Sequence, residues 1–235
     1  IKVAQPNIIV FTIQEKFEYS GAVGGFIHLF GYPFCRGRIF SNVELKNNYN
    51  TTREVFWASG TCFAVRRSTF IEHNGFDESF FAHMEEIDLC WRFHAMGYQT
   101  WVEPLSTVYH KNAVSLPMHS HRKYYLNHRN SLLMLFSNYS VLNTFYIGTI
   151  RIMLEFIALV YAILKLNLNH ASGIIRSLLW ILLHPVTIIS RRNHFKKLRK
   201  IKDRYILSKL FKGSIVLSHF IRGKKTYLDM VSKAD

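Results

Sequence analysis

The chain has 235 residues, enough for one hydrophobic core or for a core with an appendage. Its 30 Lys and Arg residues outnumber its 15 Asp and Glu residues, and the formal net charge of +15 indicates an anionic partner: a phosphate-bearing substrate, an anionic membrane surface or nucleic acid. The cysteines, Cys35, Cys62 and Cys90, are odd in number and far apart, which excludes a disulfide framework or a zinc spacing and favours a reducing compartment. Because the sequence opens at Ile1 without a signal peptide, we expect a natural start further upstream.

The first predicted element is a strand at residues 8–13. Residues 19–40 are rich in glycine and aromatic residues, and we interpret them as a long functional loop with one short helix at 25–30. Arg36 and Arg38 in this stretch either bind a phosphate or carboxylate group or are solvated loop arginines, and the sequence favours both alternatives equally.

Residues 44–54 are polar and predict an exposed excursion, after which two apolar runs flank Ser59 and Gly60. The second run, residues 62–65, predicts a buried strand. The small side chains around Ser59 and Gly60 would let a ligand approach the backbone closely. A short helix is predicted next, at residues 68–74.

Three clustered carboxylates, Glu85, Glu86 and Asp88, begin an amphipathic run that predicts a helix ending at Gly97. The carboxylates therefore fall in the first helical turn, where the helix dipole favours negative charge and keeps an acid ionised. An ionised acid can accept a proton during catalysis. The structural alternative is that these acids only cap the helix and that Asp88 and Arg92 form an ordinary surface pair.

Two short strands are predicted at 100–103 and 107–110, separated by a proline. His110 at the end of the second strand is either structural or a metal ligand. Residues 120–138 predict a helix, and the polar cluster at 127–130 on this helix either binds a phosphate or sugar or is a solvated face.

Residues 145–166 and 174–189 are nearly all apolar, and each is close to the length of a membrane span. Arg151 and Glu155 would be costly in lipid, so we favour helices that lie in the membrane interface or pack on the preceding domain, with true spans as the alternative. The polybasic stretch 191–204 follows, and such segments bind anionic cytoplasmic leaflets.

Residues 74–81 read Asn-Gly-Phe-Asp-Glu-Ser-Phe-Phe, and residues 85–92 read Glu-Glu-Ile-Asp-Leu-Cys-Trp-Arg. These motifs, in this order along the chain, resemble the acceptor-side signature of glycosyltransferase family 2. Two further segments, at 57–62 and 108–110, also resemble the family. The segment at 125–130 resembles its bacterial members that build surface polysaccharides. The resemblance covers residues 1–140, and the tail less closely.

The resemblance implies an α/β fold: the acceptor half of a GT-A (Rossmann-like) glycosyltransferase domain at 1–143, followed by a helical, membrane-associated region at 144–235. Family members are inverting and transfer a sugar from a nucleotide-diphosphate donor, with a divalent metal (Mg or Mn) bridging the diphosphate. The nucleotide pocket and the Asp-x-Asp metal motif of the family are missing from this sequence. We therefore expect the chain by itself to bind a donor poorly and to be inactive.

Carried over by position, Glu86 is the general base. The family more often has Asp there, which leaves Glu85 as the alternative. His110 matches a histidine that helps to hold the metal in some members, Trp57 offers a stacking face for a sugar ring, and Arg129 contacts a phosphate. The full set of predicted substrate-binding residues is Trp57, Ser59, Gly60, Asp88, Arg129, Asn130, Arg36 and Arg38.

The expected partners are a nucleotide-sugar donor, a glycan or lipid-linked acceptor and an anionic membrane surface, with no nucleic acid. The expected location is the cytoplasmic face of the bacterial inner membrane, in the synthesis of cell-surface polysaccharide. The alternative is a non-catalytic basic protein that binds a membrane surface or nucleic acid. A nucleic-acid module would interleave basic and aromatic residues, whereas here the basic run adjoins two apolar segments.

Overall fold

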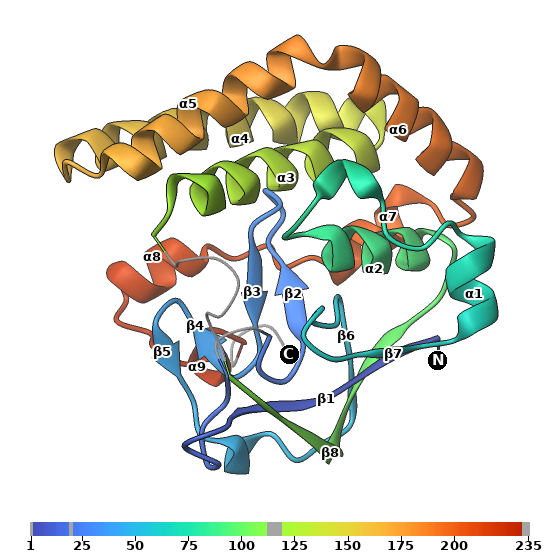
Figure 1. Ribbon diagram of the computed structural model, residues 1–235, viewed down its shortest axis with the longest axis vertical. Helices are drawn as coiled ribbons and strands as arrows, with labels where there is room; N and C mark the ends of the chain where they lie inside the picture. The colour runs from blue at the N-terminus through green and yellow to red at the C-terminus, as the bar shows by residue number, and fades with distance from the viewer. Residues whose placement is uncertain (1, 19–20, 112–118, 232–235) are drawn as a thin grey trace.

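The computed structural model describes residues 2–18, 21–111 and 119–231 (Figure 1). The strands within these residues form two sheets of four strands each: β1 (Val3–Val10), β2 (Gly25–Ile27), β3 (Pro33–Cys35), β4 (Arg38–Ile39), β5 (Asn42–Val43), β6 (Arg53–Val55), β7 (Ala64–Val65) and β8 (Thr100–His110). The helices are α1 (Arg67–Glu72), α2 (Glu85–Ala95), α3 (His121–Asn138), α4 (Val141–Leu164), α5 (Leu168–Leu183), α6 (Pro185–Leu198), α7 (Asp203–Lys209), α8 (Ile215–Phe220) and α9 (Tyr227–Val231). Short 3-10 turns lie at Lys46–Asn48 and Glu78–Phe80.

The first sheet has the order β6-β8-β1-β7, with the parallel pair β1 and β8 at its centre. β1 begins earlier than predicted, and β8 is continuous through Pro104, so the prediction of two separate strands was wrong. The pairing shifts register between Pro6 and Asn7, and the Asn7 side chain donates a hydrogen bond to the Pro104 carbonyl at 3.1 Å. Prolines lack a backbone N–H, and the sheet accommodates them at this irregularity.

The second sheet, in the order β2-β3-β4-β5, lies where a long loop and a short helix at 25–30 were predicted, so that prediction was wrong. Strands of two or three residues are too short to show the alternation by which a strand is recognised in sequence. Gly25 in β2 lies against the Trp57 ring, and a Cβ at Gly25 would come within 1.9 Å of it. Glycine is required there because the backbone and the ring approach closely.

The predicted helices at 85–97 and 120–138 are confirmed as α2 and α3. The Ser120 hydroxyl accepts a hydrogen bond from the Lys123 N–H and so caps α3. The apolar stretches form α4 and α5, and Pro185 starts α6, where a missing N–H is tolerated. Helices α3, α4 and α5 lie side by side as a layer at one end of the molecule (Figure 1).

The chain after α6 returns to the sheets. The Phe211 N–H donates a hydrogen bond to the Ile27 carbonyl at 2.9 Å. Tyr227 stacks on Phe26 with ring centroids 5.5 Å apart. The division of the chain at 143/144 stays a prediction, and residues from both of its sides share one hydrophobic core.

α4 is the one helix among the described residues that is long and apolar enough to cross a membrane, with 24 residues and a mean hydropathy of 2.0 over an 18-residue window. α5 and α6 pass the same test only as a pair, which is bent by 72°. Arg151 and Glu155 of α4 are 1% and 0% exposed and pair with each other against the protein. These two charged side chains therefore face the protein and not the exposed side of α4, so the free-energy cost of placing them in lipid does not apply.

Candidate active site

Glu85 and Glu86 open α2, and Glu86 lies against the segment of small residues around Gly60. The Gly60 N–H donates a hydrogen bond to the Glu86 carboxyl group. A Cβ on Gly60 would lie 3.7 Å from the Glu86 carboxyl carbon, so the two segments are in contact. The neighbouring Ser59 N–H donates to the Gln5 side chain at 2.7 Å, which fixes this segment to β1. The structure thus brings together two of the predicted site residues, Gly60 and Glu86.

Both carboxyl groups hold one oxygen, Oε2, that is buried and has no hydrogen-bond partner among the described residues. Burial and the neighbouring Glu85 raise the pKa of Glu86 to about 7, and burial also raises the pKa of Glu85. The expectation that the helix dipole favours the ionised form of Glu86 was wrong, because burial and the like charge of Glu85 outweigh the dipole. A carboxyl group with a pKa near 7 is well matched to proton abstraction at neutral pH.

Glu86→Gln is expected to stabilise the fold at high pH. The folded-state pKa is raised, so ionisation of wild-type Glu86 costs the folded state free energy as pH rises from its ordinary pKa of 4.5 through about 7. Because the Glu86 side chain is partly accessible to solvent, the effect is smaller than the full pKa shift implies. We expect the free energy of unfolding of the variant to be higher by on the order of 2 kcal/mol at pH 8. Urea denaturation at pH 4.5 and pH 8 measures this, and an equal difference at both pH values would contradict the raised pKa.

The loop before α2 has an unusual backbone. Phe81, His83 and Met84 have positive φ angles of 62°, 67° and 72°, a region that residues other than glycine rarely adopt. The last of the three directly precedes Glu85. Such strain persists only where surrounding contacts hold it, and it is concentrated at functional sites.

Asn130 and Arg129 of α3 hold this loop. The Asn130 side-chain NH2 donates to the carbonyls of Phe80, Ala82 and His83 at 3.0, 2.8 and 2.7 Å. Arg129 donates to the Phe80 carbonyl at 2.9 Å. Both side chains are buried, at 0% and 7% exposure, so they position the loop that leads into the carboxylates of α2 rather than meet a phosphate or sugar as predicted.

Asn130→Ala is expected to release the loop, because it leaves buried carbonyl groups without donors. We expect a loss of about 2 kcal/mol in the free energy of unfolding and faster amide exchange at residues 81–84. Hydrogen–deuterium exchange measures the second effect. Asn127→Ala, at a partly exposed position on the same helix, is the matched control. Unchanged exchange at 81–84 in Asn130→Ala would show that the loop is held by other contacts.

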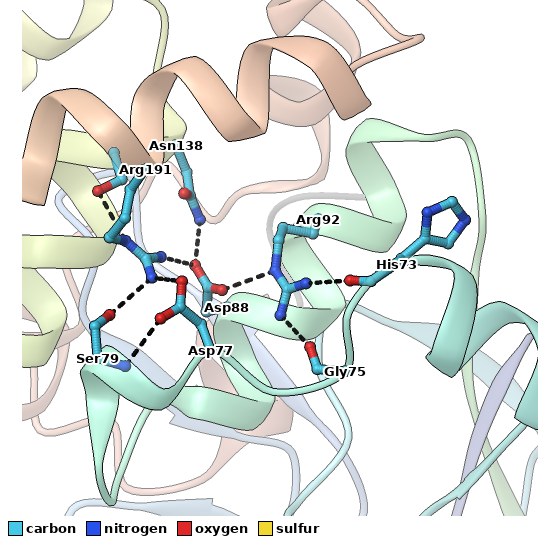
Figure 2. A network of polar contacts seen from close by, with 9 residues as sticks. His73, Gly75, Asp77, Ser79, Asp88, Arg92, Asn138 and Arg191 are labelled. Carbon is cyan, nitrogen blue, oxygen red and sulfur yellow. Dashed lines mark hydrogen bonds and ion pairs between the residues drawn. The ribbon is translucent and has the colours of Figure 1, made fainter.

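Asp88 lies at the centre of a buried polar network (Figure 2). It is 0% exposed, and its carboxylate accepts hydrogen bonds from Arg92 at 2.9 Å, Asn138 at 2.9 Å and Arg191 at 2.8 Å. The prediction of an ordinary surface pair between Asp88 and Arg92 was wrong, because the pair is buried. Both Asp88 oxygens have protein partners, so its role is structural and not the predicted contact with substrate.

The network joins α2, α3, α6 and the loop after α1. Arg92 donates to the carbonyls of His73 at 3.0 Å and Gly75 at 2.6 Å. Arg191 also pairs with Asp77, as Figure 2 shows. The sequence interpretation missed Arg191, since the basic stretch that contains it was interpreted only as membrane-binding and its partner Asp88 lies 103 residues away.

The other predicted substrate-binding residues contact the second sheet and its surroundings. Trp57 is 6% exposed and donates to the Phe26 carbonyl at 2.9 Å, so no open ring face remains for a sugar. The Arg36 guanidinium is buried over the Tyr49 ring at 4.9 Å. Arg38 donates to the carbonyl of residue 40 at 2.8 Å. All three side chains therefore make contacts that stabilise the fold of this chain.

His110 ends β8, and its Nδ1 lies 3.3 Å from Oε2 of the buried Glu18. Within residues 2–18, 21–111 and 119–231, no group of three or more His, Cys, Asp or Glu side chains is arranged to hold a metal ion. A single His–Glu pair does not supply the set of oxygen ligands that Mg²⁺ or Mn²⁺ prefers. The described residues therefore do not fit the expected metal.

No family model matches this sequence. An N-acetylglucosaminyl-diphospho-decaprenol L-rhamnosyltransferase of Mycobacterium tuberculosis is 43% identical over 63 residues, which are 27% of this chain and 20% of that protein. Rhamnosyltransferase WbbL of Escherichia coli K12 is 34% identical over 100 residues, which are 42% of this chain and 38% of that protein. The chain is thus similar to two bacterial rhamnosyltransferases, and the match spans less than half of the length of each.

Proposed function

We propose that this chain is the acceptor-side part of an inverting family 2 glycosyltransferase. It would move a deoxyhexose from a nucleotide-diphosphate donor to a lipid-linked or glycan acceptor in the synthesis of bacterial cell-surface polysaccharide. The observation that carries the proposal is the Glu86 carboxyl group beside Gly60, with a pKa raised to about 7. The similarity to two rhamnosyltransferases, one of them named for a diphospho-decaprenol acceptor, supports the choice of sugar and lipid.

In this reaction Glu86 accepts the proton of an acceptor hydroxyl group while that oxygen forms a bond to the anomeric carbon of the donor. The bond from that carbon to the phosphate oxygen breaks, and the nucleotide diphosphate leaves with the electron pair. Because attack and departure occur on opposite faces, the anomeric configuration inverts. Glu85 contributes through its charge, which raises the pKa of Glu86 and makes it a stronger base.

A sugar-transfer assay on the product of the full open reading frame that encodes this chain tests the proposal. We expect rhamnose transfer from a nucleotide-diphosphate donor to a polyprenyl-diphospho-N-acetylglucosamine acceptor. The 235-residue chain alone is expected to transfer little, because the resemblance assigns the donor pocket to a preceding half. A full-length product that transfers no hexose or deoxyhexose would contradict the proposal. Tighter binding to DNA or RNA than to anionic vesicles would favour the nucleic-acid-binding alternative.

We place this reaction at the cytoplasmic face of the bacterial inner membrane. The start of α4 presents Val141, Leu142, Phe145 and Tyr146 to solvent at 76%, 78%, 77% and 70% exposure. Exposed apolar surface of this extent is typical of a site of interaction with a protein or membrane. Arg192 of α6 donates a hydrogen bond to the Thr144 hydroxyl of α4 at 2.9 Å, and the last turn of α6 carries Lys196 and Lys197, whose charge suits an anionic lipid surface.

Vesicle binding is expected to depend on both features. The chain should bind phosphatidylglycerol vesicles more tightly than phosphatidylcholine vesicles, and high salt should weaken the binding. Leu142→Glu is expected to weaken it by about tenfold, because a charge replaces an exposed apolar side chain that is proposed to contact the membrane. Co-sedimentation measures this. Leu105→Glu, at a 92% exposed position on β8, is the control, and equal losses in both variants would exclude the start of α4 as the membrane contact.

A further inference from the structure

A groove of about 620 Å³ runs between α4 and α6, next to the end of α3. Its volume lies in the range of small-molecule sites in proteins. Apolar side chains form most of its wall, among them Phe145, Met153, Phe156 and Ile188. Gly148 also lines it, and a Cβ there would come within 2.9 Å of a ring atom of Phe136. The absence of a side chain at this position lets α4 approach the Phe136 ring of α3 closely.

One cation, Arg192, lines this groove among the described residues. Its Nη1 donates to the Phe136 carbonyl at 2.5 Å and to the Thr144 hydroxyl at 2.9 Å, and the side chain is partly exposed. Arg191 and Arg199 on either side of it in sequence pair with carboxylates. Arg192 has no ion pair with a carboxylate in the part of the chain that the structure describes. The groove therefore combines an apolar wall with one positively charged side chain.

We infer that this groove binds the isoprenoid chain of the lipid-linked acceptor, with the acceptor diphosphate at Arg192. The inference rests on the proposed function, which supplies the lipid-linked acceptor. An isoprenoid diphosphate has the same two parts as the groove, an apolar chain and an anionic group at one end. Phe145 and Met153 are 77% and 60% exposed, so the groove opens directly onto the apolar face of α4 that is proposed to meet the membrane. The isoprenoid chain can therefore enter the groove from the bilayer without passing through water.

The position of α6 also connects this groove with the catalytic helix. Arg191, the residue before Arg192, binds Asp88 at 2.8 Å, and Asp88 lies two residues after Glu86. The turn of α6 that carries Arg192 is therefore fixed to α2 by the preceding residue, Arg191.

Isothermal titration of the purified chain with farnesyl diphosphate, an isoprenoid carrying a diphosphate, tests the inference. We expect wild type to bind farnesyl diphosphate at least tenfold more tightly than inorganic diphosphate. Met153→Glu places a charge in the groove and is expected to weaken binding by tenfold or more. Ile157→Glu is the matched control, one turn further along α4 at 63% exposure and outside the groove, and should change binding by less than twofold.

Phe156→Glu, also in the groove, provides a second variant at an exposed position if Met153→Glu folds poorly. Equal binding of farnesyl diphosphate by wild type and both groove variants would overturn the inference. So would equal affinity of wild type for inorganic diphosphate, or an equal loss in Ile157→Glu, which would indicate a general apolar surface.

Glu86→Gln separates this inference from the proposed function. It is expected to bind farnesyl diphosphate as wild type does, because it leaves the groove intact. If titration shows the expected pattern and sugar transfer is never observed, the groove stands and the proposed function fails. If transfer is observed and the groove variants bind normally, the groove inference fails alone.

Discussion

Glu86→Gln is expected to lower kcat for sugar transfer by about 100- to 10,000-fold, the usual contribution of a general base. Gln has nearly the same shape and can still accept the hydrogen bond from the Gly60 N–H, but it cannot remove a proton from the acceptor. KM should change by less than about threefold, because the lost interaction forms only in the transition state. Steady-state kinetics on the full-length product measure both constants.

Glu85→Gln is the matched control for this loss. It removes the charge that helps to raise the pKa of Glu86, so the variant should keep most of its kcat and work at lower pH than wild type. If Glu85→Gln abolished transfer and Glu86→Gln did not, the proton acceptor would be Glu85. That outcome would confirm the alternative assignment from the sequence, in which Glu85 is the general base.

Asp88→Asn is expected to destabilise the fold by about 3–5 kcal/mol, the second large effect in this protein. The substitution leaves the buried Arg92 and Arg191 without the carboxylate that both contact. α6 should then detach from α2 more readily. Urea denaturation followed by circular dichroism measures the change.

Glu72→Gln is the control for Asp88→Asn, because the Glu72 side chain is 67% exposed. Its effect should stay within about 0.5 kcal/mol, as for most surface substitutions. A cost below about 1 kcal/mol for Asp88→Asn would show that the network does not hold α6 in place.

The helices could be predicted because their signals are local. The amphipathic run after Glu85 marks α2, and Ser120 marks the start of α3. The second sheet could not be predicted, because its strands are too short to carry a periodic pattern. The candidate base could be identified only through the resemblance, since acidic first turns are common in helices that have no catalytic role.

The side chains that hold the candidate site in place could not be predicted for a different reason. Asn130 and Phe80 are 50 residues apart, and Arg191 and Asp88 are 103 residues apart. Nothing at these positions in the sequence indicates which side chain meets which. Positive φ at Phe81 is also invisible in sequence, because tertiary contacts impose it against the preference of the residue.

The pH dependence of kcat/KM for sugar transfer tests most directly whether Glu86 is the proton acceptor. If Glu86 is the acceptor, kcat/KM rises tenfold per pH unit below about pH 7 and levels off above it, as the Glu86 carboxyl ionises in the free enzyme. A profile that is flat between about pH 5 and pH 8 would mean that no group with this pKa takes part in the reaction.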